Sequence, residues 1–82
     1  MSKLFVIGIG YKPFEKRALE IIRSSDIILA NDRLLEVLKG YEEFEDIRKR
    51  LRIINNVYET MDFIKSEMQN PKSRIITLLA SG

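Results

Sequence analysis

The chain has 82 residues, of which 45% are hydrophobic and 32% charged, a balance typical of one soluble globular domain with a modest core. It contains no Cys and no His, which excludes a disulfide framework, a thiol nucleophile, an imidazole-based triad and a transition-metal site within these residues. The net charge of +2 is too small to indicate a nucleic-acid partner. Neither an apolar segment of roughly 18 residues nor a signal-peptide pattern occurs, which predicts a cytoplasmic protein without a membrane partner.

A strand and a helix are predicted in the first quarter of the chain. Lys3–Ile7 is a short apolar strand, and residues 8–10 follow it as a flexible Gly-Ile-Gly loop. Pro13 suits the first turn of the next helix, because its missing N–H would be unpaired there in any case. The buried stripe of that helix is predicted from helical spacing and consists of Phe14, Ala18, Ile21 and Ile22.

The middle of the chain predicts a second strand and a short helix. Ile27–Ala30 is an apolar run typical of a buried strand, and either Asn31 or Asp32 can cap the helix after it. Gly40 is placed to end that helix. Its apolar residues are Leu34, Leu35 and Leu38. The spacing in residues 41–50 fits a helix and a loop with one or two turns equally well.

The last third predicts a strand, a longer helix and a final strand. Arg52–Ile54 is a very short strand, and Asn56 followed by Glu59 resembles a capping box that opens the helix. Arg74–Leu79 is an almost unbroken apolar run, typical of a strand covered on both faces in a parallel sheet. The predicted buried side of the helix consists of Val57, Met61, Ile64 and Met68.

The alternation of strands and helices predicts an α/β fold in which a parallel sheet of about four strands carries helices on both faces. In such sheets ligands bind just beyond the carboxyl ends of the strands. Three segments should therefore meet at one rim: residues 8–13, 31–33 and 80–82. The small-residue turn formed by Ala80, Ser81 and Gly82 is expected to lie at that rim.

The glycines of the first loop suggest that a ligand approaches the backbone there. Gly8 and Gly10 would expose amide groups to an anion at the start of the following helix. A dinucleotide fingerprint would need a third glycine where Pro13 stands. Asp32 lies at a suitable distance to bind a ribose hydroxyl, but it would serve equally well as a helix cap.

Polar and aromatic side chains near the first loop offer further contacts. Lys12, Lys16 and Arg17 could attract a carboxylate-rich or phosphorylated substrate, or they could simply solvate the start of a helix. Tyr11 could stack on a flat ligand or pack against the protein. The basic cluster formed by residues 48–50 and Arg52 is predicted to be a solvated helix face.

In chain order, five segments resemble the tetrapyrrole (corrin/porphyrin) methylase family: residues 4–10, 17–22, 25–28, 33–36 and 78–82. The Arg-Leu-Leu-Glu helix and the Leu-Ala-Ser-Gly ending are most similar to the precorrin-6Y methyltransferase (decarboxylating) branch of cobalamin biosynthesis. The resemblance covers the whole chain and corresponds to the start of the N-terminal domain of that family. Residues 1–82 are therefore expected to form a partial N-terminal domain whose C-terminal domain is absent.

The resemblance implies a two-domain, usually dimeric enzyme that transfers a methyl group from S-adenosyl-L-methionine to a ring carbon of a precorrin. Its implied cofactor-binding residues are Ala80, Ser81 and Gly82, and its implied cleft-lining residues are Gly8, Gly10, Tyr11, Lys12 and Arg33. Methyl transfer depends on in-line positioning more than on a strong acid or nucleophile, so the lack of His and Cys is no obstacle. A carboxylate-fringed substrate would also give the lysines and arginines near the first loop groups to bind.

The sequence departs from the family in ways that predict a chain without activity of its own. Its first loop is shorter than the usual Gly-x-Gly-Pro-Gly loop, and no Asp-Pro follows Gly82. Half a cleft loses most of the contacts that hold a ligand, so this chain alone is expected to bind the cofactor weakly or not at all. Uncovered apolar surface should also cause self-association, for example as a homodimer.

Two alternatives remain open at this point: a non-catalytic α/β interaction or regulatory module, and a nucleotide- or phosphate-binding module.

Overall fold

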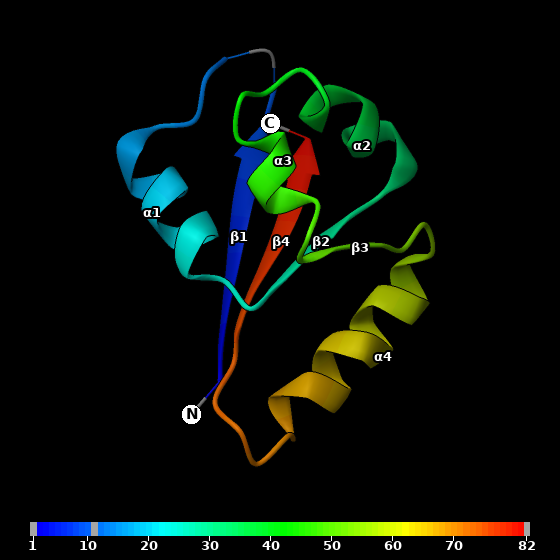
Figure 1. Ribbon diagram of the computed structural model, residues 1–82. Helices are drawn as coiled ribbons and strands as arrows, with labels where there is room; N and C mark the ends of the chain where they lie inside the picture. The colour runs from blue at the N-terminus through cyan, green and yellow to red at the C-terminus, as the bar shows by residue number, and fades with distance from the viewer. Residues whose placement is uncertain (1, 11, 82) are drawn as a thin grey trace.

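The computed structural model describes residues 2–10 and 12–81. Within these residues four strands form one parallel sheet, in the order β1-β4-β2-β3 (Figure 1). The predicted parallel α/β fold is therefore confirmed. The strands are β1 (Lys3–Ile9), β2 (Ile27–Ala30), β3 (Leu51–Ile53) and β4 (Ile75–Ser81).

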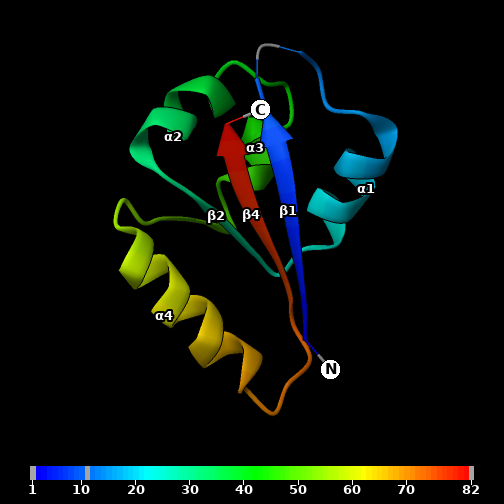
Figure 2. The same cartoon turned by 180° about the vertical axis from the view of Figure 1, so that it is seen from behind.

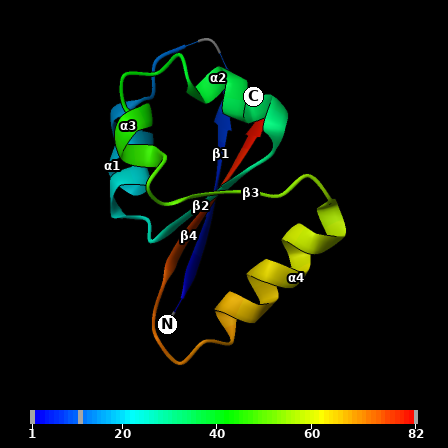
Figure 3. The same ribbon diagram turned by 45° about the vertical axis from the view of Figure 1, so that its right-hand side comes forward.

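The sheet carries helices on both faces, as Figure 3 shows from the side. The described residues form four helices: α1 (Lys16–Ser24), α2 (Asp32–Leu38), α3 (Phe44–Ile47) and α4 (Val57–Met68). Ile22 of α1, Leu38 of α2 and Ile47 of α3 belong to one core cluster on one face. On the other face Ile64 of α4 packs against Leu29 and Ile76.

The chain order explains why β4 is the central, continuously apolar strand. The connection from β1 to β2 runs over one face through α1, and the connection from β3 returns over the other face through α4. This return places β4 between β1 and β2, with neighbours on both edges and helices on both faces. Ile76 and Thr77 in β4 are consequently fully buried. The buried Thr77 hydroxyl lies 2.6 Å from the hydroxyl of Ser25, which satisfies it.

Two strands are longer than predicted, and this changes the position of the candidate site residues. Gly8 and Ile9 belong to β1, not to a loop, and Ala80 and Ser81 belong to β4, not to a turn. In the parallel register Gly8 lies opposite Ala80 and Ile9 opposite Ser81. Backbone pairing between neighbouring strands extends both elements beyond the point where the side-chain pattern ends. The third strand also begins one residue earlier than predicted, at Leu51.

At the helix starts, the structure selects Asn31 over Asp32 as the cap of α2, confirms Asn56 as the cap of α4 and corrects the start of α1. The Asn31 side chain accepts a hydrogen bond from the Leu34 N–H at 2.9 Å, and the Asn56 side chain accepts from two N–H groups of α4. The first helix, however, begins at Lys16, so Pro13 and Phe14 lie before it and not in its first turn. The open region 41–50 contains the short helix α3.

The predicted buried side of α4 is largely wrong. Ile64 is buried, but Val57, Met61 and Met68 are 74%, 52% and 43% exposed. Figure 2 shows α4 on the side of the sheet where β2 lies, with β4 between α4 and β1, so the helix leaves β1 uncovered. Ile64, the one buried residue of α4, packs on Leu29 of β2 and Ile76 of β4. In β1, Val6 is 63% exposed.

Candidate functional site

A cleft of about 1000 Å³ opens at the carboxyl-terminal rim of the sheet. Its lining residues come mainly from the end of β1, the connection to α1, and α2, and these elements lie in the upper part of Figure 1. Five of the residues predicted from the sequence line it: Gly8, Gly10, Lys12, Arg33 and Ser81. These residues come from three separate parts of the chain, and the parallel direction of the strands brings them to one rim, as predicted. That they bind a ligand stays a prediction.

The other predicted residues are placed differently. Ala80 lies directly beside Gly8 in the sheet but does not contribute to the described lining of the cleft. Lys16 and Arg17 are exposed in the first turn of α1 and do not contribute to that lining either. Tyr11 and Gly82 lie outside the described residues.

Asp32 holds two strand ends together. Its backbone N–H donates to the Asn55 Oδ1 atom at 2.9 Å, and the Asn55 Nδ2 atom donates to the Asp32 Oδ2 atom at 2.8 Å. This pair joins the residues that follow β2 to those that follow β3. The side chain that caps α2 belongs to Asn31, so Asp32 is not the cap. Asp32 is not part of the described cleft lining, and its binding of a ribose hydroxyl stays a prediction.

An aromatic pair that the sequence analysis did not assign to the site forms part of the cleft wall. The rings of Phe14 and Tyr41 are stacked, with centroids 4.4 Å apart and planes inclined by 21°. The spacing of apolar residues predicts Phe14 in the buried stripe of the first helix. Tyr41 lies in residues 41–50, where a helix and a loop fit the sequence equally well. Pairing of these rings depends on tertiary contact, so no local pattern could have revealed it.

The Tyr41 hydroxyl also holds the backbone at the mouth of the cleft. It donates to the carbonyl oxygen of Gly10 at 2.5 Å and to that of Lys12 at 2.7 Å. A hydroxyl carries one proton, so the two carbonyls share it. Tyr41 belongs to the connection between α2 and α3, far along the chain from the segment it holds.

The charges around the cleft are mixed in sign. Lys12 and Arg33 supply cationic groups, and neither forms an ion pair with another described residue. Glu15 and Glu36 supply carboxylates, of which Glu36 is paired with the exposed Lys39 at 3.5 Å. Such a lining can match a ligand that carries charges of both signs, whereas a purely anionic ligand would meet the two carboxylates as well.

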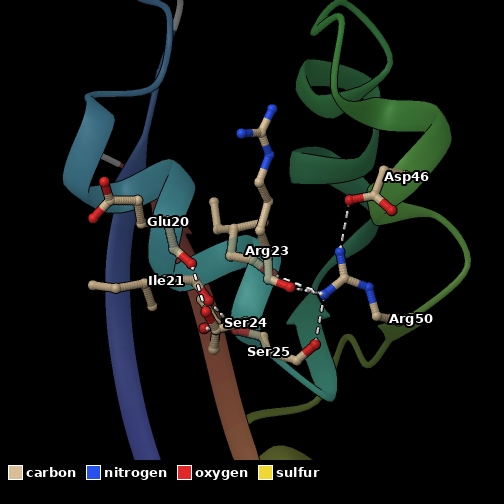
Figure 4. Close-up of polar contacts among 9 residues, drawn as sticks. Glu20, Ile21, Arg23, Ser24, Ser25, Asp46 and Arg50 are labelled. Carbon is tan, nitrogen blue, oxygen red and sulfur yellow. Dashed lines mark hydrogen bonds and ion pairs between the residues drawn. The ribbon is translucent and has the colours of Figure 1, made fainter.

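The prediction of a solvated basic cluster near α3 is confirmed for the exposed Arg48, Lys49 and Arg52 and is wrong for Arg50. One Arg50 nitrogen donates to the carbonyl oxygens of Ile22, Arg23 and Ser25, at 2.9, 3.2 and 2.5 Å. The other terminal nitrogen pairs with Asp46 at 2.9 Å (Figure 4). Arg50 therefore caps the carboxyl end of α1, where carbonyl groups lack helical partners.

Arg52 also has a structural contact, because its guanidinium lies 4.8 Å from the centre of the Phe63 ring.

The described residues contain no group of three or more His, Cys, Asp or Glu placed to hold a metal ion. Among them, no helix has the length and apolar character needed to cross a membrane. The residues of the cleft can bind and orient a small molecule through aromatic stacking, mixed charges and backbone groups.

In comparisons with known proteins, no family model, curated protein or solved structure matches the chain.

Proposed function

We propose that the chain forms the N-terminal part of an S-adenosyl-L-methionine-dependent methyltransferase that acts on a ring carbon of a precorrin-type tetrapyrrole, in the manner of the precorrin-6Y branch. The cleft at the rim of the sheet is its cofactor and substrate cleft, and a second domain completes it. The observation that carries the proposal is the meeting of Gly8, Gly10 and Ser81 at this one cleft. These residues belong to two of the segments on which the family resemblance rests, at opposite ends of the chain.

The residues present fit this cofactor chemically. S-adenosyl-L-methionine carries a carboxylate, an ammonium and a sulfonium group, and the cleft offers Lys12 and Arg33 as well as Glu15 and Glu36. A Cβ atom built on Gly10 would meet nothing within 4 Å, so the backbone at that residue is open to a ligand. Ser81 would contribute a hydroxyl from the end of β4.

When bound, the cofactor supplies an electrophilic methyl group. The residues of this chain have to hold the ligand in line with a ring carbon, which depends on rigid contacts and not on a strong base. The stacked pair Phe14 and Tyr41 offers an apolar face to a flat ring. Lys12 and Arg33, which lack ion-pair partners among the described residues, are available for the carboxylates at the edge of a tetrapyrrole.

The test is isothermal titration of S-adenosyl-L-methionine into the protein expressed at the length that its coding sequence gives. We expect saturable binding that Gly10→Val weakens, because the added side chain would enter the space next to the backbone. Glu59→Gln serves as a control, since Glu59 is exposed on α4 and does not contribute to the described cleft lining. Absence of saturable heat with the natural protein would contradict the proposal.

The same titration with ATP and with inorganic phosphate separates the proposal from a phosphate-binding module. The first turn of α1 has no side-chain cap and carries Lys16 and Arg17, which is the feature that would favour phosphate. Binding of ATP or phosphate at concentrations where S-adenosyl-L-methionine does not bind would replace the methyltransferase proposal with that alternative.

A further inference from the structure

We propose that Tyr41 is a positioning residue of the cleft, which fixes Gly10, Lys12 and Phe14 from the distant connection between α2 and α3. The inference rests on the proposed function only for the identity of the ligand, because the arrangement of Tyr41 is independent of it. Gly10 and residues 12–14 line one side of the cleft, and residues of α2 line another. Their conformation therefore sets the shape that a ligand meets.

The hydroxyl fixes the first half of this segment. It bonds the carbonyl oxygens of Gly10 and Lys12 at 2.5 and 2.7 Å, two residues apart in the chain. These two carbonyls form no other hydrogen bond with the residues that the structure describes. Gly10 has no side chain to pack, and a Cβ atom there would touch nothing, so Gly10 does not hold itself in place by packing.

The ring fixes the second half. Phe14, two residues beyond Lys12, stacks on Tyr41 at 4.4 Å and also packs on the core cluster that contains Ile22 and Leu38. Tyr41 itself packs on that cluster, and its backbone N–H donates to the Leu38 carbonyl at 3.0 Å. One side chain anchored in the core thus contacts both ends of the segment.

This arrangement reduces the entropy that the segment loses when a ligand binds. A wall that is already held in one conformation leaves more of the contact energy for affinity, whereas an untethered Gly-containing segment has to be ordered at binding. The sequence separation between residue 41 and residues 10–12 means that a change in the connection between α2 and α3 alters the cleft without touching a ligand.

The experiment compares three variants by NMR and by ligand binding. Tyr41→Phe removes the hydroxyl and keeps the ring, Phe14→Leu removes the stacked ring and keeps the hydroxyl, and Tyr58→Phe removes a hydroxyl from an 81% exposed tyrosine on α4 as the matched control. The first readout is the carbonyl ¹³C shifts of Gly10 and Lys12 and the backbone ¹⁵N relaxation of residues 10, 12 and 14, measured without ligand.

We expect Tyr41→Phe to shift both carbonyl resonances and to increase fast backbone motion at Gly10 and Lys12, while amide signals in α4 and β3 stay in place. Phe14→Leu should increase motion chiefly at residue 14 and keep both carbonyl shifts, and Tyr58→Phe should change neither measurement. If Tyr41→Phe leaves the carbonyl shifts and the relaxation of this segment as in the natural chain, the positioning role is wrong. This result does not depend on any ligand.

The second readout is the affinity of the protein, at the length its coding sequence gives, for S-adenosyl-L-methionine. Tyr41→Phe loses the preorganisation that about one net hydrogen bond provides, so we expect its affinity to be roughly five-fold weaker. The affinity of Tyr58→Phe should not change. Equal affinity of Tyr41→Phe and the natural protein would overturn the role in binding. If neither binds, the proposed function fails, and the NMR measurement still decides whether Tyr41 positions the segment.

Discussion

Arg50 joins three parts of the molecule through one guanidinium group. It lies just before β3, bonds three carbonyls at the end of α1, and pairs with Asp46 of α3 (Figure 4). Its side chain is 22% exposed, whereas that of Asp46 is 60% exposed. The contacts to the carbonyls are therefore expected to matter more than the ion pair, because exposed ion pairs contribute little to stability.

Replacing Arg50 with Met is expected to lower the free energy of unfolding by about 2 kcal/mol, since the aliphatic stem remains but the carbonyls at the end of α1 lose a charged donor. Asp46→Asn keeps those bonds and should cost less than about 1 kcal/mol. Urea denaturation followed by circular dichroism measures both. Equal losses for the two variants would show that the ion pair, and not the cap, carries the stability.

Gly10 separates the demands of the fold from those of a ligand. Its φ is not positive, and a Cβ atom would have open space around it. Gly10→Ala should leave the chain as stable as before, or stabilise it by up to about 1 kcal/mol, because alanine restricts the unfolded chain. A loss of stability in thermal unfolding would contradict this description of the residue. A loss of S-adenosyl-L-methionine binding without a loss of stability would locate the ligand at this backbone.

At the scale of elements, α4 packs on the sheet through only part of its apolar stripe. Ile64 is its one buried residue and packs on Leu29 and Ile76, while Val57 and Met61 project from the helix into solvent. Four apolar residues of α4 follow helical spacing, but only Ile64 among them is buried. Its N-terminus is held independently by the Asn56 cap.

Ile64→Ala is expected to destabilise the chain by roughly 2–4 kcal/mol, because it leaves a cavity between α4 and the sheet. Met61→Ala, at an exposed position on the same helix, should change the free energy of unfolding by less than about 0.5 kcal/mol. Chemical denaturation distinguishes them. Similar losses at both positions would mean that Met61 is covered in solution, for instance by another molecule.

At the scale of the whole molecule, one face of the sheet is only partly covered. We call four exposed apolar residues of β1 and α4 the bare face; they are Leu4, Val6, Val57 and Met61. β1 is an edge strand, and after Lys3 it contains no charged residue or proline that would protect it from pairing with another strand. Helix α4 is acidic through Glu59, Asp62 and Glu67 against Lys65, whereas β1 begins with Lys3.

We therefore expect the chain to self-associate, with α4 of a second copy lying on the bare face. The acidic residues of that helix would then meet Lys3 at the start of β1. Val6→Lys should shift the sedimentation equilibrium toward monomer. Glu20→Gln, which changes the net charge by the same amount on the opposite face, should not. A natural chain that stays monomeric at all measured concentrations would refute the expectation, as would equal dissociation by both variants.

Local pattern determined much of this fold by itself. The apolar run Ile27–Ala30 and the cap Asn56 are short-range signals that the structure confirms, and Asn31 is one of the two caps predicted for α2. The alternation of strands and helices was enough to predict parallel pairing, because right-handed crossovers leave few other arrangements. That pairing in turn brought Gly8 and Ser81 to a common rim, so the position of the cleft could be predicted before its shape was known.

Tertiary contact alone decided the features that depend on residues distant in sequence. Three such contacts join residues that are 25 to 31 positions apart in the sequence. They are the stack of Phe14 on Tyr41, the hydrogen bonds of the Tyr41 hydroxyl to Gly10 and Lys12, and the cap that Arg50 places on α1. Periodicity describes which face a side chain takes on its own element, but it cannot say whether another element covers that face. For the same reason it assigned Met61 to the core, although the residue is 52% exposed.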